Sequence, residues 1–286
     1  MKLQILIPRY NESEDILKPL LDSILIQQHI DFSDIGIIIC DDGSNNKLSE
    51  LFLDPYRAKI KIELHNDKHR GISGTRNALI SYATAEYIMF CDADDMFYTV
   101  TALWLILSGM KNGFDVLISD FFEEGFDPVT CNYTNVRHSL ELMYIHGKVY
   151  RRQYLLDNMI HFPESILLHE EHFFNSLCFS FSSNIKHCDV PLYLWKWRAN
   201  SVTTSNPKFN QISYPELIRC KCALLNELIA RGAKSNAVDC VGSFVYDVFY
   251  TVNSEEWNLP ENEIYKKKVE RLFAEVFPEY KYLWDI

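Results

Sequence analysis

The sequence predicts an α/β fold, in which a doubly wound, mainly parallel sheet is flanked by helices. Strand-like and helix-like segments alternate through the first half of the chain, which is typical of a parallel sheet with crossover helices. The apolar run Tyr87–Cys91 stops at three carboxylates between Asp92 and Asp95, as expected where a buried strand meets a ligand-binding edge. From about Asn206 onward, apolar residues recur at helical spacing, which predicts a helical C-terminal extension.

Each predicted element of the first half has one clear periodicity. Strands are expected where apolar residues run without a break or alternate, and helices where they recur every three or four residues. The expected strands are Leu3–Pro8, Ile35–Cys40, Lys59–Leu64, Tyr87–Cys91 and Asp115–Ile118. The expected helices are Glu12–Gln28, Ile72–Ala85 and Thr101–Lys111. The middle of the chain, from Phe121 to about Ser205, is more aromatic and less regular.

The chain has 286 residues, which suits one large domain or one domain with a smaller appendage. A change of pattern at Asn206-Pro207 predicts a boundary, with one domain over residues 1–205 and a helical region over 206–286. Within that region, helices are expected at Tyr214–Ala230, Val238–Thr251 and Glu263–Phe277.

Composition limits the binding partners and the cellular compartment that we expect for the protein. The net charge of -11 disfavours unspecific affinity for nucleic-acid backbone or anionic lipid. The eight Cys residues are scattered and show no zinc-site spacing, which predicts reduced thiols and a cytoplasmic location. The chain starts with a strand pattern and no signal-peptide profile. No run approaches the roughly 18 apolar residues of a membrane span.

Polar loops follow three of the expected strands. They are Pro8–Glu12, Asp41–Ser44 and Asp92–Asp95, and in a parallel sheet they emerge at one edge, where they can meet on one ligand. Crowded carboxylates need a compensating positive charge. A hard divalent cation such as Mg²⁺ or Mn²⁺ prefers oxygen ligands and brings phosphate oxygens with it. For Asp92–Asp95 alone, a solvated acidic turn is the alternative.

A fourth polar segment, His69–Asn77, opens the helix that precedes the acidic strand. Its glycines permit close backbone approach, and a helix N-terminus with Arg side chains suits anionic phosphates. Acidic residues for a metal beside basic residues for phosphate form a coherent nucleoside-diphosphate site.

As an ordered set, these motifs resemble family 2 glycosyltransferases of the GT-A fold. The matching stretches are Pro-x-Tyr-Asn at Pro8–Asn11, Asp-Asp-Gly-Ser at Asp41–Ser44, Gly-x-x-x-x-Arg-Asn at Gly71–Asn77, Asp-x-Asp-Asp at Asp92–Asp95, Gly-Lys-x-x-Arg-Arg at Gly147–Arg152 and Tyr-x-x-x-x-Arg-x-x-Ser at Tyr193–Ser201. The resemblance covers about residues 1–205, and the C-terminal region carries no part of it.

The resemblance implies a metal-dependent, inverting transfer of a sugar from a UDP-linked donor to an acceptor hydroxyl. Carried over by position, the donor-binding residues are Pro8, Tyr10, Glu12, Asp42, Gly71, Arg76, Asp92, Ala93 and Asp94. Pro8 and Tyr10 would line the nucleobase and ribose pocket, Asp42 would hydrogen-bond a uracil, and Arg76 would lie near the phosphates. Asp92 and Asp94 would hold the cofactor, Mn²⁺ or Mg²⁺.

The chain departs from the family at its Glu-Asp pair, where it has Glu170-Glu171. By position, Glu171 would be the catalytic base that takes the proton of the acceptor hydroxyl. Its extra methylene extends the carboxylate, so either the pocket compensates or Glu170 takes the role. An acidic pair at a helix start, favoured by the helix dipole, is the structural alternative. Glu170, Lys148, Trp195 and Arg198 are further candidates for acceptor or phosphate contacts.

The sequence leaves the acceptor open among a glycan, a lipid-linked or cell-wall polymer, a protein and a modified base. The C-terminal helices could be an acceptor platform, a homo-oligomer interface or a structural brace. Two other functions are weighed. A nucleotidyltransferase should carry a Gly-rich loop with Lys or Arg after the first strand, where this chain has Pro8–Glu12. A catalytically inactive nucleotide- or sugar-binding protein is supported only by Glu171 in place of Asp.

Overall fold

The computed structural model describes residues 1–199, 201, 209–235, 237–240, 242–243, 263–264, 266–267 and 270–271. The chain divides into two compact units, one formed by Met1–Phe162 with Ser182–Arg198 and the other by Pro163–Phe181 with Ala199–Ile286. The boundary expected near residue 205 stays a prediction. The internal contacts group residues 163–181 with the C-terminal part.

The first unit is built on one nine-stranded sheet. Its strands are β1 (Leu3–Arg9), β2 (Ile35–Asp41), β3 (Lys61–Asn66), β4 (Tyr87–Phe90), β5 (Met96–Phe97), β6 (Val116–Asp127), β7 (Asn132–His138), β8 (Lys148–Arg151) and β9 (Ile185–Trp195). They lie in the order β3-β2-β1-β4-β8-β6-β9-β5, with β7 beside β6. The predicted α/β fold class is therefore confirmed.

The four strands β3, β2, β1 and β4 are mutually parallel, as predicted. Beyond β4 the sheet is mixed, because β8 runs antiparallel to β4 and β6, while β6 and β9 are parallel. Every residue of β1 and β2 is buried, which explains why both strands are mostly apolar and do not alternate with polar residues. The strand order reverses between β1 and β4, and ligands bind at such a switch point in open α/β sheets.

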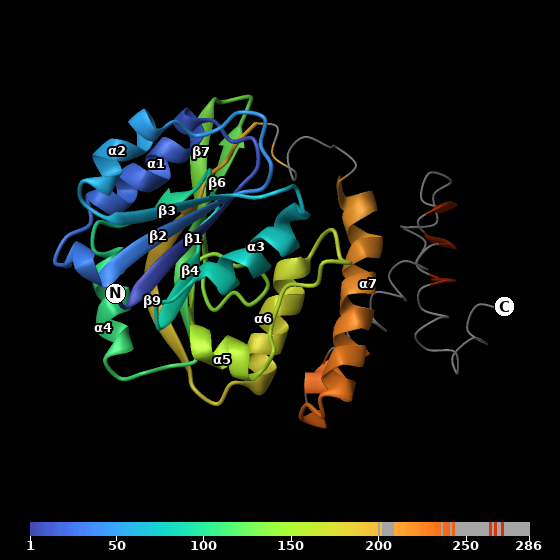
Figure 1. Ribbon diagram of the computed structural model, residues 1–286. Coiled ribbons are helices and arrows are strands. Elements are labelled where there is room, and N and C mark those ends of the chain that lie inside the picture. Colours follow the sequence, from blue (N-terminus) through green and yellow to red (C-terminus); the bar gives the residue numbers. More distant parts are fainter. Residues whose placement is uncertain are drawn as a thin grey trace. The chain divides into compact units, whose positions relative to one another are not determined.

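Helices cover both faces of this sheet. In the first unit they are α1 (Glu14–Leu25), α2 (Glu50–Arg57), α3 (Gly71–Tyr82), α4 (Ala102–Met110) and α5 (Arg152–Asp157), with a 3₁₀ turn at Phe32–Asp34. Right-handed crossovers place α1 and α2 on one face and α3 on the other, as Figure 1 shows. The sequence prediction missed α2, whose short amphipathic pattern includes Pro55.

A long hairpin formed by β6 and β7 was also missed. Only Asp115–Ile118 was expected as a strand, whereas β6 continues to Asp127 and pairs with β7 from Phe121↔His138 to Asp127↔Asn132. The outer residues of β6 are partly exposed, and β7 is almost wholly exposed, so they lack the apolar pattern that identifies a buried strand. The green hairpin stands at the top of the sheet in Figure 1.

The second unit contains α6 (Glu170–Phe181) and α7 (Phe209–Ala230), which pack against each other. The helix expected at Tyr214–Ala230 is confirmed as the main part of α7. The helices expected at Val238–Thr251 and Glu263–Phe277 lie largely outside the described residues. Among the residues that are described, no helix is long and apolar enough to cross a membrane. All eight Cys residues are free thiols.

Candidate active site

Arg9, at the end of β1, organises the first two loops of the site. Its side chain is 1% exposed, and its guanidinium forms an ion pair with Asp41 at the end of β2. Its Nε donates to the carbonyl oxygen of Glu12 (2.8 Å), and its Nη2 donates to that of Asn46 (2.6 Å). Lys47 Nζ donates to the other carboxylate oxygen of Asp41 at 2.9 Å. One buried cation thus connects the loops after β1 and β2.

Tyr10 presents a flat ring beside this buried network. It is 48% exposed, and its ring centroid lies 4.5 Å from that of His69. Its backbone N–H donates to Glu12 Oε2 at 2.7 Å. Burial raises the pKa of Glu12, although this backbone hydrogen bond opposes the shift. Pro8, the other residue predicted for the nucleobase pocket, is buried within β1.

Asp42 caps the N-terminus of α3. Its Oδ1 accepts from the backbone N–H of Arg70 (2.7 Å) and its Oδ2 from that of Gly71 (3.0 Å), which satisfies two amides that a helix start leaves unpaired. His69 Nδ1 lies 2.9 Å from Asp42 Oδ2. A carboxylate has further acceptor capacity, so the predicted contact of Asp42 with a uracil stays a prediction.

Gly43 is required where the loop after β2 approaches the start of α3. Its φ of +79° is a conformation that L side chains rarely adopt, and a Cβ there would lie 2.8 Å from the backbone nitrogen of His69. Gly71 has a similar φ of +78°, although no atom lies within 4 Å of its absent Cβ. The Asp-Asp-Gly-Ser motif therefore contains a glycine for two steric reasons.

We expect Gly43→Ala to lower the free energy of unfolding by more than the ~1–2 kcal/mol that left-handed backbone alone costs, since the backbone contact adds to it. The matched control is Gly113→Ala, because Gly113 has a φ of +59° and nothing within 4 Å of a Cβ. Urea unfolding of both variants would measure the difference. Equal losses of free energy of unfolding in the two variants would show that the loop can move to accommodate a Cβ at residue 43 without further cost.

Arg76 lies on α3 and reaches the acidic loop. Its side chain is 2% exposed, and its Nη2 donates to Asp92 Oδ1 at 3.0 Å. Its guanidinium also lies over the ring of Phe162, 5.4 Å from the centroid. Arg76 therefore neutralises part of the acidic cluster from a buried position. Its predicted place beside donor phosphates is not tested by these contacts.

The acidic loop after β4 holds its three carboxylates in different ways. The side chains of Asp92 and Asp94 are 27% and 23% exposed, and Asp94 Oδ2 accepts from Arg198 Nε at 2.8 Å. Asp95 is 1% exposed. Its Oδ2 accepts from the Tyr193 hydroxyl (2.6 Å), and its Oδ1 accepts from the backbone N–H of Lys196 (2.9 Å). Ala93 is buried between the two open carboxylates.

Burial and charge repulsion together raise the pKa values of two carboxyl groups in this loop. Burial and the neighbouring Asp92 raise the pKa of Asp94, which Arg198 partly lowers again. Burial, followed by Asp92 and Asp94, raises the pKa of Asp95 well above its usual value. Such crowding favours a compensating cation.

The structure brings together a set of candidate metal ligands that differs in part from the predicted one. One ligand atom each of Asp92, Asp95 and His146 lies within 4.8 Å of the others. The sequence predicted the pair Asp92 and Asp94, and Asp94 instead pairs with Arg198. Because Asp95 is buried and already accepts two hydrogen bonds, the more exposed Asp92 and Asp94 present the more accessible oxygen atoms.

In the second unit, the predicted base lies at the start of α6. Glu170 is buried, at 8% exposure, whereas Glu171 is partly exposed. His169, just before the helix, has a φ of 69°, and its Nε2 lies 2.8 Å from Ser213 Oγ on α7. Among the described residues, neither ring nitrogen of the buried His172 has a hydrogen-bond partner. Burial lowers the pKa of His172 to about 3.

The remaining predicted contacts fall into different environments. Lys148 has no exposed side-chain surface, and its Nζ donates to the carbonyl oxygen of Tyr144. The ring of Trp195 lies 4.9 Å from that of His146. Arg198 pairs with Asp94 and has 34% of its side chain exposed. Of these three, Arg198 has the geometry of a site residue, whereas the roles of Lys148 and Trp195 stay predictions.

Several contributors to the site escaped the sequence analysis. Arg9 stood within a recognised loop, yet an Arg in a turn gives no sign that it is buried. His146 lies in the irregular middle of the chain, where no periodicity marks it. His69 was part of a Gly- and Arg-rich segment, and Tyr10, whose ring contacts the ring of His69, is distant in sequence. The contact between the rings of Tyr10 and His69 becomes evident only in the structure, where the two loops that carry them lie side by side.

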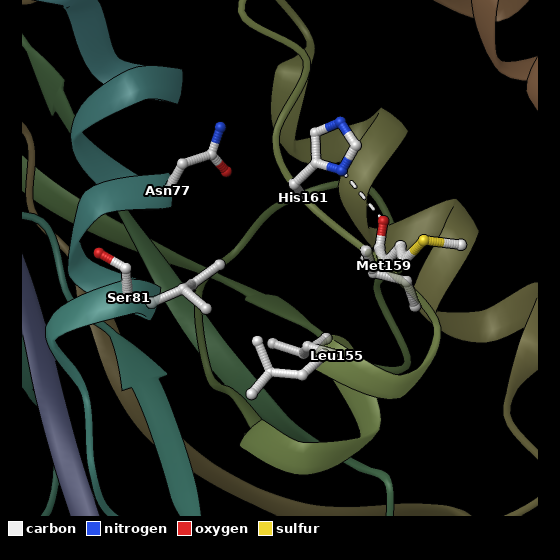
Figure 2. Close-up of a pocket in the computed structure, with 8 residues that line it drawn as sticks. Asn77, Ser81, Leu155, Met159 and His161 are labelled. Atoms are coloured by element: carbon white, nitrogen blue, oxygen red, sulfur yellow. Dashed lines mark hydrogen bonds between the residues drawn. The ribbon is translucent and has the colours of Figure 1, made fainter.

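A separate hollow of about 330 Å³ opens beside α3. Its lining is mainly apolar, with Leu155 and Met159 opposite Asn77 and Ser81 of α3, as Figure 2 shows. His161 Nδ1 lies 3.0 Å from the carbonyl oxygen of Met159. None of the acidic or basic residues of the site lines this hollow, so we assign it no part in the chemistry.

Comparison with known proteins places these features in a family. The model of the family "Glycosyl transferase family 2" matches residues 4–169, more than half of the chain. The uncharacterized glycosyltransferase EpsJ of Bacillus subtilis is 26% identical over 219 residues, which cover 70% of this chain and 62% of EpsJ. The chain thus spans less than two thirds of the length of this relative.

Two solved structures are similar in fold. Staphylococcus aureus TarS 1–349, in complex with UDP-GlcNAc, has a TM-score of 0.75 at 18% identity, over 96% of this chain and 82% of that one. By sequence, TarS is a poly(ribitol-phosphate) β-N-acetylglucosaminyltransferase that is 23% identical over 77% of this chain and 39% of its own length. The Pyrobaculum calidifontis mannosyltransferase PcManGT, with GDP-Man and Mn²⁺, has a TM-score of 0.59 at 12% identity, over 99% and 87% of the two chains.

Proposed function

Because the chain belongs to glycosyl transferase family 2, we propose that it transfers a sugar from a UDP-linked donor to an acceptor hydroxyl, with inversion at the anomeric carbon. The observation that carries this proposal is the acidic loop at the switch point of the sheet, where the partly exposed Asp92 pairs with Arg76 and the partly exposed Asp94 pairs with Arg198. The complex of TarS with UDP-GlcNAc supports a uridine nucleotide.

The donor would occupy the edge formed by the loops after β1, β2 and β4. Tyr10, whose exposed ring adjoins His69, would stack on the nucleobase, with Asp42 at its hydrogen-bonding edge. Arg198, more exposed than Arg76, would contact the diphosphate and leave Asp94 when it does so. Pro8, Glu12, Gly71 and Ala93 would shape the pocket by their backbone positions.

The residues present fit a divalent cation. Asp92 and Asp94 offer partly exposed carboxylate oxygens, and burial together with the neighbouring charge of Asp92 raises the pKa of Asp94, so a cation at this place would favour its charged form. A bound Mn²⁺ or Mg²⁺ supplies neutralisation of the leaving diphosphate. The Mn²⁺ in PcManGT supports this cofactor, whose identity in this protein is part of the proposal.

The transfer itself would be a single displacement. The acceptor oxygen forms a bond to the anomeric carbon while the bond from that carbon to the diphosphate oxygen breaks, and UDP leaves. Glu171 would take the proton of the acceptor hydroxyl. Its partial exposure suits this role better than the burial of Glu170. A nucleotidyltransferase is disfavoured, since the first loop is Pro8–Glu12 and has no phosphate-cradling glycines.

Calorimetric titration of UDP, with Mn²⁺ and again with EDTA, tests the donor site. We expect micromolar binding that disappears in EDTA and in Asp94→Asn, with GDP and CDP binding more weakly because of the nucleobase pocket. The matched control is Asp54→Asn, which removes an exposed carboxylate on α2. If no nucleoside diphosphate binds with metal present, the donor assignment is wrong and the chain keeps only the fold of its family.

The acceptor, oligomerisation through the C-terminal helices and a cytoplasmic location stay predictions. Catalytic inactivity has no support beyond Glu171 in place of the family's Asp.

A further inference from the structure

Three aromatic rings form an open cluster at the outer part of the β6–β7 hairpin. The Phe126 centroid lies 4.7 Å from that of Trp197 and 5.0 Å from that of Tyr133, and the Tyr133 and Trp197 centroids are 6.4 Å apart. Tyr133 is 60% exposed, and the other two rings are partly exposed. We call these three residues the hairpin platform.

The hairpin platform contributes little to the core of the sheet. Beyond Glu123↔Trp195, β6 no longer pairs with β9, and residues 124–127 pair only with β7. None of the three rings belongs to the main hydrophobic cluster. Large aromatic side chains that are left open to solvent in this way are commonly contact residues for a ligand or partner.

Hydrogen bonds to carboxylates hold the segment that carries Trp197 next to the acidic loop. The residue after Trp197 is Arg198, whose Nε donates to Asp94 at 2.8 Å. The residue before it is Lys196, whose N–H donates to Asp95 at 2.9 Å. The N–H of Trp197 itself donates to Glu124 Oε2 at 3.2 Å on β6. The segment 196–198 is thus fixed on one side to the candidate metal ligands and on the other to the hairpin.

The chemistry of the hairpin matches a neutral polyhydroxylated ring. Aromatic faces are electron-rich and attract the polarised C–H groups of a sugar face. Beside the rings, Glu124 and the exposed Asn135 form a cross-strand pair that can hydrogen-bond hydroxyl groups. The hairpin also carries Glu123 and Asp127, and its only Lys or Arg is Arg137, which Asp120 holds at 2.5 Å. Lys196 and Arg198 flank Trp197, and Arg198 pairs with Asp94. The carboxylates of the hairpin outnumber these two cations, and this charge balance disfavours a polymer of phosphate groups.

On the basis of the proposed glycosyltransferase function, we propose that the hairpin platform binds the acceptor through a neutral sugar ring. Phe126, Tyr133 and Trp197 would stack against that ring and place a saccharide acceptor beside the donor site. The acceptor class is therefore a neutral glycan, in contrast to the poly(ribitol-phosphate) in the name of TarS.

Acceptor binding can be measured by calorimetry on the full chain, with saturating UDP and Mn²⁺ and again without them. The probes are neutral β-linked tetrasaccharides of glucose and of N-acetylglucosamine, and poly(ribitol phosphate). We expect at least one tetrasaccharide to bind more tightly than poly(ribitol phosphate). Tyr133→Ala and Trp197→Ala should each raise its Kd about tenfold, whereas Tyr133→Phe, which keeps the ring, should change it less than about twofold.

The matched control is Trp104→Ala, because Trp104 is a 43% exposed aromatic residue on α4, and it should leave saccharide binding unchanged. UDP affinity should be the same in Tyr133→Ala as in the wild type, which separates this proposal from the donor assignment. Failure of UDP to bind would reject the proposed function instead. The hairpin platform is rejected if neither tetrasaccharide binds, if Tyr133→Ala binds it as the wild type does, or if the phosphate polymer is preferred.

Discussion

Asp41→Asn is expected to lower the free energy of unfolding by about 3–5 kcal/mol, because it removes the anionic partner of a buried Arg. Both side chains of the Arg9–Asp41 pair are only 1% exposed. In the variant, the Arg9 guanidinium would keep the carbonyl oxygens of Glu12 and Asn46 and would face a neutral amide in place of the carboxylate. Urea unfolding followed by circular dichroism would measure the loss.

Two comparisons make this test specific. Lys18→Met removes an ion pair whose side chains are 55% and 47% exposed, and it should cost less than about 1 kcal/mol. The double variant Arg9→Met with Asp41→Leu should recover most of the loss, since neither buried charge remains. A cost for Asp41→Asn no greater than that for Lys18→Met would show that the buried pair does not hold the two loops.

The same pair sets a dependence of stability on pH. Burial acts to raise the pKa of Asp41, but hydrogen bonds from Lys47 and Ser44 and the charge of Arg9 together lower it. A carboxyl whose pKa is lowered on folding stabilises the fold above its unfolded pKa, and this contribution is lost as the pH falls through the lower folded value. Asp41→Asn should therefore unfold with a weaker acid dependence than the wild type.

Glu171→Gln is expected to reduce sugar transfer by about a hundred- to ten-thousand-fold, because an amide cannot take the proton from the hydroxyl group of the acceptor. UDP affinity should be unchanged, since Glu171 is not assigned to the donor. Initial rates with a UDP-sugar and an acceptor found by screening would be compared with calorimetric UDP binding for the same preparation.

Glu170→Gln and Glu164→Gln are the comparison variants for this result. Glu164 is exposed and should be neutral. If Glu170 were the base, the large loss would move to Glu170→Gln, and Glu171→Gln would keep its turnover. Full turnover in both variants would reject an acidic base at the start of α6. The two carboxylates would then serve only to stabilise the N-terminus of that helix through its dipole.

Sequence reasoning succeeded where a single pattern determines the structure. The short apolar runs of β1, β2 and β4, each closed by a polar loop, indicate buried strands, and these polar loops share one sheet edge because the strands are parallel. It failed where partners are distant in sequence. The ion pair of Arg9 with Asp41, the approach of His146 to Asp95 and the pairing of β6 with β7 depend on tertiary contacts. The sequence carries no local periodicity for any of them.

The hairpin beyond Glu123 has a consequence for how the protein can change over evolutionary time. Its outer residues pair only with one another, whereas at the edge proposed for the donor Asp41 holds a loop in place and Asp42 holds a helix start in place. Substitutions around Tyr133 would therefore alter the recognised acceptor at little cost in folding. Substitutions at the donor edge would endanger the fold itself. We therefore expect proteins with this fold to diverge in the acceptor that they recognise while they keep the same donor.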